Sequence, residues 1–175
     1  MQRLIGGMVL VAALLPGVAT AQHDDAKHEF GVDAVFLYRK PSGGTGRWVF
    51  GGPADIRIGF VSKSSLMFEA GFQFAFSGGG GVSDHDVSLG VAAQWSKDHR
   101  KGLFVQAGPA IEFVGGTGSP SGTAFSVFGD IGTRIPYGSG AFRLSTGLRY
   151  SPENTTLGAA SSVNVHVRAG LSLWH

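Results

Sequence analysis

The end of the chain carries the pattern that most restricts its fold. Apolar residues occupy every second position from Val163 to Leu173, and the positions between them are polar or Gly. A period of two puts the apolar side chains on one face of a β-strand and the polar side chains on the other. A long closing strand of this kind is typical of a sheet that faces lipid on one side and a polar interior on the other.

Seven upstream segments repeat this alternation, which gives eight strands of about eleven residues each. Together the expected strands cover 30–39, 48–62, 66–76, 85–95, 103–114, 125–135, 141–151 and 163–173. The run Gly51-Gly52-Pro53 interrupts the second strand as a bulge or marks its true start. Pro109 removes one ladder hydrogen bond from the fifth strand, where we expect a local bulge.

Composition agrees with a sheet that does not face water on all sides. Only 15% of the residues are charged and 29 of the 175 are Gly, whereas about a quarter of the residues in an ordinary globular protein are charged. Cys is absent, which excludes disulfides and Cys-based chemistry. The formal net charge is +2 without a basic run, and this argues against nucleic acid as a partner.

The first 21 residues have the features of a secretory signal peptide. Arg3 precedes an apolar stretch from Leu4 to Val18, and Ala19-Thr20-Ala21 forms a small-x-small cleavage site before Gln22. A transmembrane anchor is the alternative, but the apolar stretch is short and ends in the cleavage pattern. We therefore expect an exported protein with one β-barrel domain at 22–175.

The connections between the expected strands alternate in length. Those after the second, fourth and sixth strands, which begin at Lys63, Ser96 and Pro136, are short or charged. The others, including a Gly-rich loop over 77–84, are longer and rich in Gly, Ser and Thr. Strands joined in order by such connections predict an all-β fold, an eight-stranded antiparallel up-and-down transmembrane barrel with both termini on the side of the short turns.

The placement of charges supports a membrane-spanning wall. Every charge within the strands falls on the face opposite the apolar residues, where an Arg or Lys on the apolar face would cost about 2–4 kcal/mol at the bilayer midplane. We expect an interior charge network from twelve of these polar-face residues: Asp33, Asp55, Arg57, Glu69, Asp86, Glu112, Asp130, Arg134, Arg143, Arg149, His166 and Arg168. Arg39 lies on the same face.

A soluble eight-stranded barrel with an apolar pocket, as in lipocalins, is the alternative architecture. It would have to enclose the bulky face that includes Phe68, Phe72, Phe74, Phe76 and Trp95. An eight-stranded barrel has little interior room, and the opposite face, small and often Gly, suits it better. The membrane barrel is therefore the favoured fold.

The signal peptide, the eight alternating strands and the closing strand resemble the small outer-membrane β-barrel proteins of Gram-negative-type bacteria, the OmpA/OmpX-like group. The resemblance covers residues 22–175. It implies an outer-membrane location, surrounding lipids and lipopolysaccharide, and recognition of the closing strand by the barrel assembly machinery. The group usually ends on an aromatic residue, whereas here Trp174 is followed by His175.

Two layers of charge are expected inside the barrel. Asp33, Arg57, Glu69 and Arg168 lie at similar heights on neighbouring strands, and Arg149, Glu112, Asp86 and His166 would form an upper layer. A packed, salt-bridged core is the favoured interpretation, since buried charges must be paired. A small selective pore for solutes is the alternative.

Catalytic and metal-binding interpretations have weaker support. His85 lies near Ser83, Asp84 and Asp86 in a set that resembles Ser-His-Asp, and lipid A-modifying barrel enzymes are of similar size. Adjacency in sequence does not establish catalytic geometry, so we expect no enzyme. The histidines show no metal-ligand spacing, and we expect no metal and no cofactor. Aromatic residues near strand ends fit interfacial girdles, namely Tyr38, Trp48, Trp95, Tyr137, Tyr150 and Trp174.

The sequence thus predicts a monomeric outer-membrane barrel with a structural or surface-binding role, mediated by four external loops.

Overall fold

The computed structural model describes residues 27–49, 54–63, 65–79, 82–117 and 121–175. The predicted signal peptide, the predicted interruption at Gly51-Gly52-Pro53 and the tips of two loops lie outside these residues. No helix in the described part of the chain is long and apolar enough to cross a membrane.

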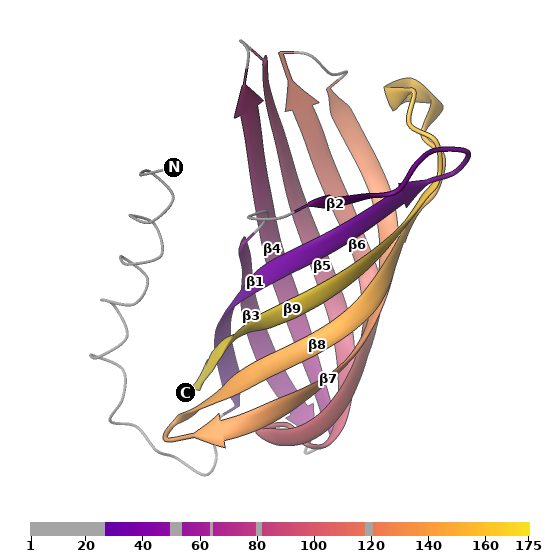
Figure 1. Ribbon diagram of the computed structural model, residues 1–175. Coiled ribbons are helices and arrows are strands. Elements are labelled where there is room, and N and C mark those ends of the chain that lie inside the picture. The colour runs from indigo at the N-terminus through magenta and orange to yellow at the C-terminus, as the bar shows by residue number, and fades with distance from the viewer. Residues whose placement is uncertain (1–26, 50–53, 64, 80–81, 118–120) are drawn as a thin grey trace.

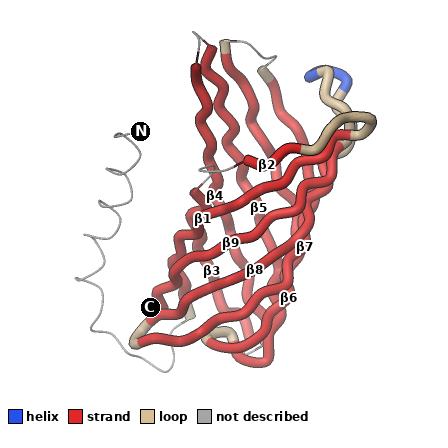
Figure 2. Tube along the Cα trace, in the orientation of Figure 1, coloured by secondary structure: helices blue, strands red, loops and turns tan. Residues whose placement is uncertain are grey.

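The described strands form one antiparallel sheet that closes on itself (Figures 1 and 2). In chain order they are β1 (His28–Pro41), β2 (Arg47–Val49), β3 (Ala54–Lys63), β4 (Leu66–Gly79), β5 (Val82–Asp98), β6 (Lys101–Gly116), β7 (Gly122–Tyr137), β8 (Gly140–Ser151) and β9 (Ser162–Trp174). Strands β2 and β3 both pair with β1, so together they correspond to the second predicted strand. The predicted eight-stranded antiparallel barrel is confirmed.

Closure depends on the pairing between the first and last strands. Strand β1 pairs with β9 without interruption, from Glu29 opposite Trp174 to Pro41 opposite Ser162. Beyond the ladder, the backbones of His28 and His175 exchange two hydrogen bonds of 3.0 and 2.9 Å. This pairing removes the open edge that a sheet of this length would otherwise expose.

The connections alternate between the two ends of the barrel, as predicted, but the β4–β5 connection is no longer than the turns at the opposite end. The β3–β4, β5–β6 and β7–β8 turns and the start and end of the described chain lie at one end, which we call the turn end. The β1–β2, β4–β5, β6–β7 and β8–β9 connections lie at the other, the loop end. Figure 1 shows the turn end below and the loop end above.

Several strands extend further than the sequence pattern indicated. Strand β5 has 17 residues, and β6 and β7 have 16 each. The predicted Gly-rich loop at 77–84 is wrong in its extent, because β4 continues to Gly79 and β5 starts at Val82. Pro136 lies within β7 and not in the predicted turn. Polar residues and Gly end the amphipathic pattern before they end the hydrogen-bonded ladder, so alternation alone underestimates strand length.

The expected bulge at Pro109 is also wrong. The register of β5 with β6 is the same on both sides of it, from Gly90 opposite Ala110 to Ala93 opposite Ala107, and only the pairs between these are missing. Pairing with β7 continues through Pro109 opposite Val127. Proline has no N–H to donate, so the ladder to β5 is interrupted without insertion of an extra residue.

The alternation of burial fixes what each face of the wall meets. Large apolar side chains of every long strand are exposed on the outside, among them Ile58 at 61%, Leu103 at 72% and Ile135 at 60%. The side chains between them point into the barrel, where most are buried and those near the loop end are half-buried. An apolar outer belt around a polar interior is the reverse of a water-soluble barrel and is typical of a wall that faces lipid.

The outer belt leads to a test of membrane depth. Ile58→Arg, at the middle of β3, is expected to lower the free energy of unfolding from lipid vesicles by about 2–4 kcal/mol, because the charge would lie near the bilayer midplane. Ile135→Arg, equally exposed but near the turn end of β7, should cost only about 0–1 kcal/mol. Denaturant titration of both variants gives the comparison, and equal small losses would contradict a lipid-facing belt.

Candidate functional site

The charged interior of the barrel is the candidate functional site. Strand alternation brings the polar-face residues into a lumen about as wide as their own side chains, since eight strands enclose little space. The buried charged residues are Glu29, Asp33, Asp55, Arg57, Glu69, Glu112, Asp130, Arg134, Arg143, His166 and Arg168, with Arg149 partly buried. We describe them from the turn end upward as lower, middle and upper clusters.

Arg57 is the centre of the lower cluster. Its guanidinium is fully buried and donates to three carboxylates. Nε and Nη2 bind the two oxygens of Asp33 at 2.8 and 3.1 Å, and Nη1 binds Glu29 at 2.8 Å and Glu69 at 3.1 Å. A planar guanidinium suits this arrangement because it can bind one carboxylate with two nitrogens and still have donors for others.

Two further arginines complete the lower cluster and balance its charge. Arg134 Nη2 lies 2.7 Å from Glu29 Oε2, and Arg143 Nη1 lies 2.8 Å from Glu69 Oε2. Three carboxylates are thus matched by three guanidiniums. The ring of Phe104 lies between the two added arginines, with its centroid 4.8 Å from Cζ of Arg134 and 4.7 Å from Cζ of Arg143. These cation–π contacts add an attraction to the buried guanidiniums.

Glycines of the inner face leave the space that these side chains fill. A Cβ on Gly31 would overlap the guanidinium of Arg57, and one on Gly170 would overlap a carboxylate oxygen of Asp33. The high Gly content therefore has a packing reason inside the barrel, where large charged groups lie against bare backbone.

The middle cluster combines Asp55, Asp130, His166 and Arg168. Arg168 Nη1 lies 3.4 Å from Asp55 and 3.3 Å from Asp130, and His166 Nε2 lies 2.5 Å from the other oxygen of Asp130. Gln106 joins this cluster to the lower one. Its amide nitrogen donates to Asp130 at 2.5 Å, while its amide oxygen accepts from Arg143 at 2.6 Å.

The upper cluster is smaller and closer to solvent. Arg149 Nη1 donates to Glu112 at 3.2 Å and to Gln73 and Ser88 at 3.3 Å each. Near the loop end, Arg39 lies 3.9 Å from Asp86, with about a third of each side chain exposed. A surface ion pair of this kind contributes little to stability.

The structure groups the predicted site residues differently from the two expected layers. Among the described residues, Arg168 pairs with Asp55 and Asp130 one layer higher, and forms no ion pair with Asp33 or Glu69. His166 belongs with Asp130, and Asp86 pairs with Arg39 and not with Arg149. These placements follow from the slanted register of a tilted sheet, in which residues at the same height are not equally far along their strands.

Three interior residues were missed by the sequence reasoning. Glu29 lies one position before the predicted start of the first strand, yet it binds Arg57, Arg134 and Ser172. Gln94 and Gln106 are uncharged, but both are buried and accept hydrogen bonds from arginines. Glu29 shares its parity with Asp33, and that signal could have identified it.

Trp174 is inside the barrel, so its predicted place in an interfacial girdle is wrong. It is 3% exposed and packs with Val61 and Met67. Its ring lies 5.5 Å from Cζ of Arg134 and meets His99 edge-on at 5.1 Å. Its position in the alternation, on the face of Arg168 and Ser172, determines where it points. Trp95, Tyr137 and Tyr150 are exposed on the outer wall, and the side chain of Trp48 lies outside those described.

A small cavity lies between the middle and upper clusters. It is bounded by Asp55, Glu69, Gln73, Arg149 and Arg168 and measures about 20 Å³. A buried water needs roughly 10–15 Å³ of such volume, so this space corresponds to about one water molecule. The ion-paired side chains around this cavity therefore form a packed polar core.

The described side chains do not show an assembled Ser-His-Asp arrangement around His85. His85 is exposed, and the side chains of Ser83 and Asp84 lie outside those described. In the same part of the chain, no group of three or more His, Asp or Glu side chains is arranged to hold a metal ion.

Comparisons with known proteins support the architecture. No protein-family model matches the sequence, and no curated protein matches it. Among solved structures, the chain is similar to Neisserial surface protein A, with a TM-score of 0.63 and 12% identity over 85% of this chain and 97% of that one. It is also similar to Ail, the attachment invasion locus protein of Yersinia pestis, with a TM-score of 0.52 and 12% identity over 85% and 99% of the two chains.

Both similar structures are small outer-membrane barrels, and the alignments cover nearly their entire length. At this level of identity the likeness concerns the fold. Strand count, closure and the apolar outer belt agree with it. The chain therefore has the fold of the small eight-stranded outer-membrane β-barrel proteins of the OmpA/OmpX-like group.

Proposed function

We propose that this protein is a monomeric, integral outer-membrane protein with a structural or surface-binding role, and that its barrel neither conducts solutes nor catalyses a reaction. The barrel would anchor the chain in the membrane and present the loop end outside the cell. Membrane lipids and lipopolysaccharide would surround it, and the barrel assembly machinery would recognise its closing strand β9.

The observation that carries this proposal is the packed ion-pair core. Every cluster bridges strands on different sides of the lumen, as in the contact of Arg134 on β7 with Glu29 on β1. A buried pair of this kind opens only at a cost of about 3–5 kcal/mol, because breaking it leaves an uncompensated charge. A pathway for ions or solutes would require several such contacts to open together.

The loop end supports a binding role through one ordered connection. Between β8 and β9, Asn154 caps a short 3₁₀ helix (Thr155–Leu157) that ends at Gly158, whose φ of 60° suits glycine. The Asn154 side-chain amide donates to the carbonyl of Thr123 on β7 at 2.9 Å. This connection is therefore held against the barrel wall, and Glu153 and Thr156 are exposed on it.

The two similar proteins are named as a surface protein and as an attachment invasion locus protein. One Ail structure is a complex with the heparin analogue sucrose octasulfate. These names support a surface role for the present chain.

Membrane insertion is tested first. In an outer-membrane fraction, the protein should show a heat-dependent mobility shift on an SDS gel, because a closed barrel resists unfolding until it is boiled. Absence of both the shift and the fractionation would contradict the proposal as a whole.

Conductance tests the packed core. Wild-type protein in planar bilayers is expected to give no steady unitary openings, since ion pairs cross the lumen and the cavity beside Arg149 and Arg168 has room for about one water. Arg149→Ala/Arg168→Ala removes two cations from the cavity wall and should raise the leak if side chains block the barrel. Large, steady openings of the wild-type protein would favour the alternative of a small pore.

Stability tests the role of Arg57. Arg57→Met should lower the free energy of unfolding by about 3–5 kcal/mol, because Glu29, Asp33 and Glu69 would lose their shared cation. Lys101→Met is the matched control. It breaks the exposed pair with Asp98, whose atoms are 3.7 Å apart, and should change stability by at most about 1 kcal/mol. Similar effects of the two substitutions in denaturant titration would show that the core does not depend on Arg57.

A further inference from the structure

The turn end of the barrel carries an excess of basic side chains outside the interior core. The described residues there are Lys27, Lys63, Lys97, Arg100 and Lys101, against the single carboxylate of Asp98. Asp98 is engaged within its own turn, with Lys101 and with the backbone of Arg100. At the loop end, by contrast, the described residues include one exposed lysine, Lys40, and one exposed carboxylate, Glu153, so their charges balance.

Three of the lysines form an outward-facing group, which we call the lysine rim: Lys63, Lys97 and Lys101. Lys97 and Lys101 are exposed and lie two residues beyond the exposed Trp95 and Leu103, at the point where the register of β5 with β6 shifts between Ser96 and Asp98. A register shift between Val61 and Lys63 places Lys63 opposite Leu66, next to the outer wall. The rim therefore borders the apolar belt directly, where the headgroups of a membrane leaflet would lie.

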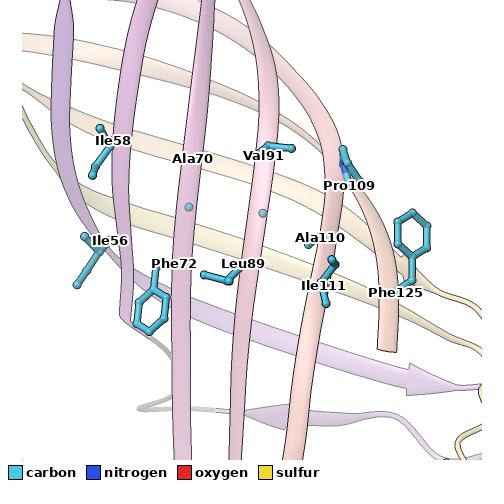
Figure 3. A pocket seen from close by; sticks show the side chains of 12 residues that line it. Ile56, Ile58, Ala70, Phe72, Leu89, Val91, Pro109, Ala110, Ile111 and Phe125 are labelled. Carbon is cyan, nitrogen blue, oxygen red and sulfur yellow. The ribbon is translucent and has the colours of Figure 1, made fainter. Parts of the chain in front are cut away.

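The wall above the rim is hollowed. A groove of about 530 Å³ crosses β3 to β7 on the apolar outer face, and its lining is almost entirely carbon. Figure 3 shows Ile58, Ala70, Val91, Pro109 and Ile111 around it. Ala70 and Pro109 are smaller than the Phe and Ile side chains beside them, and this difference creates the depression.

The distance from rim to groove matches one lipid leaflet. Val91 is six residues from Lys97 on β5, which is about 20 Å at roughly 3.3 Å per residue. On a strand tilted by about 40° this is about 15 Å along the membrane normal, half of a hydrocarbon core of about 30 Å. An acyl chain whose headgroup lies at the rim would end at the groove.

We propose that the wall formed by β3 to β6 binds an anionic phospholipid of the leaflet at the turn end. Its phosphate would lie among Lys63, Lys97 and Lys101, and one acyl chain would reach the groove. The inference rests on the proposed membrane-spanning function. The lysines favour a headgroup that carries negative charge, and the apolar groove favours contact with an acyl chain.

Each lysine near an anionic membrane surface contributes about 1 kcal/mol, which is about fivefold in affinity. Neutral lipids would gain nothing from the rim. An anionic lipid at the loop end would meet described exposed charges that balance each other, so the preference belongs to the turn end.

Quenching of Trp95 by brominated lipids provides the experiment. The full chain carrying Trp48→Phe is inserted into phosphatidylcholine vesicles that contain either brominated phosphatidylglycerol or brominated phosphatidylcholine. Trp174 is enclosed in the barrel, so its fluorescence is expected to remain unquenched and to give the baseline. Brominated phosphatidylglycerol should quench at lower mole fraction, and Lys97→Gln or Lys101→Gln should each weaken this preference about fivefold. The matched control, Lys40→Gln at the loop end, should leave it unchanged.

Three outcomes would overturn the inference: equal quenching by both lipids, an equal effect of Lys40→Gln, or a preference that appears only after Asp24→Asn/Asp25→Asn. The last result would mean that the acidic residues preceding Lys27 occupy the rim. A heat-dependent mobility shift of the same samples separates these outcomes from failure of the proposed function, since it reports insertion alone.

Discussion

The requirement that every backbone polar group find a partner is the constraint on which the rest of the structure depends. In hydrocarbon no water can satisfy an open strand edge, so a sheet can cross the membrane only if it closes. Here closure is the pairing of β1 with β9 along their length. Once the sheet is closed, each residue must face either lipid or a narrow lumen, and the alternation of the sequence becomes an alternation of two environments.

Most of the fold could be predicted because this constraint produces an alternation of apolar and polar residues with a period of two. Strand order, closure and the inward direction of the charges follow from parity. Strand ends do not, because Gly and Ser at positions such as 77–79 carry no amphipathic signal while their backbone still pairs. For Trp174, alternation was a better guide than residue type. Its residue type suggested an interface, but its parity with Ser172 placed it inside.

The partners in each ion pair were less predictable from the sequence than the side of the sheet that each residue occupies. Which acid meets which arginine depends on strand tilt and register across the lumen, and Arg168 meets Asp130 from a strand that is not its neighbour in the sheet. Such contacts are set by the three-dimensional stagger of the barrel, which one sequence does not state. Glu29 was missed for a simpler reason, since the apolar pattern begins one residue after it.

The lower cluster also has a consequence for how the protein reaches its native state. Its contacts join residues 105 and 143 positions apart, as in Arg134 with Glu29 and Ser172 with Glu29. Contacts this distant in sequence form late and slow the search for the native topology. In the middle cluster, Asp55 and Asp130 lack the guanidinium of Arg168 until β9 arrives, and an incomplete barrel would expose these charges to lipid. Arrival of the final strand and neutralisation of the lumen are therefore one cooperative event, which disfavours half-closed intermediates within the bilayer.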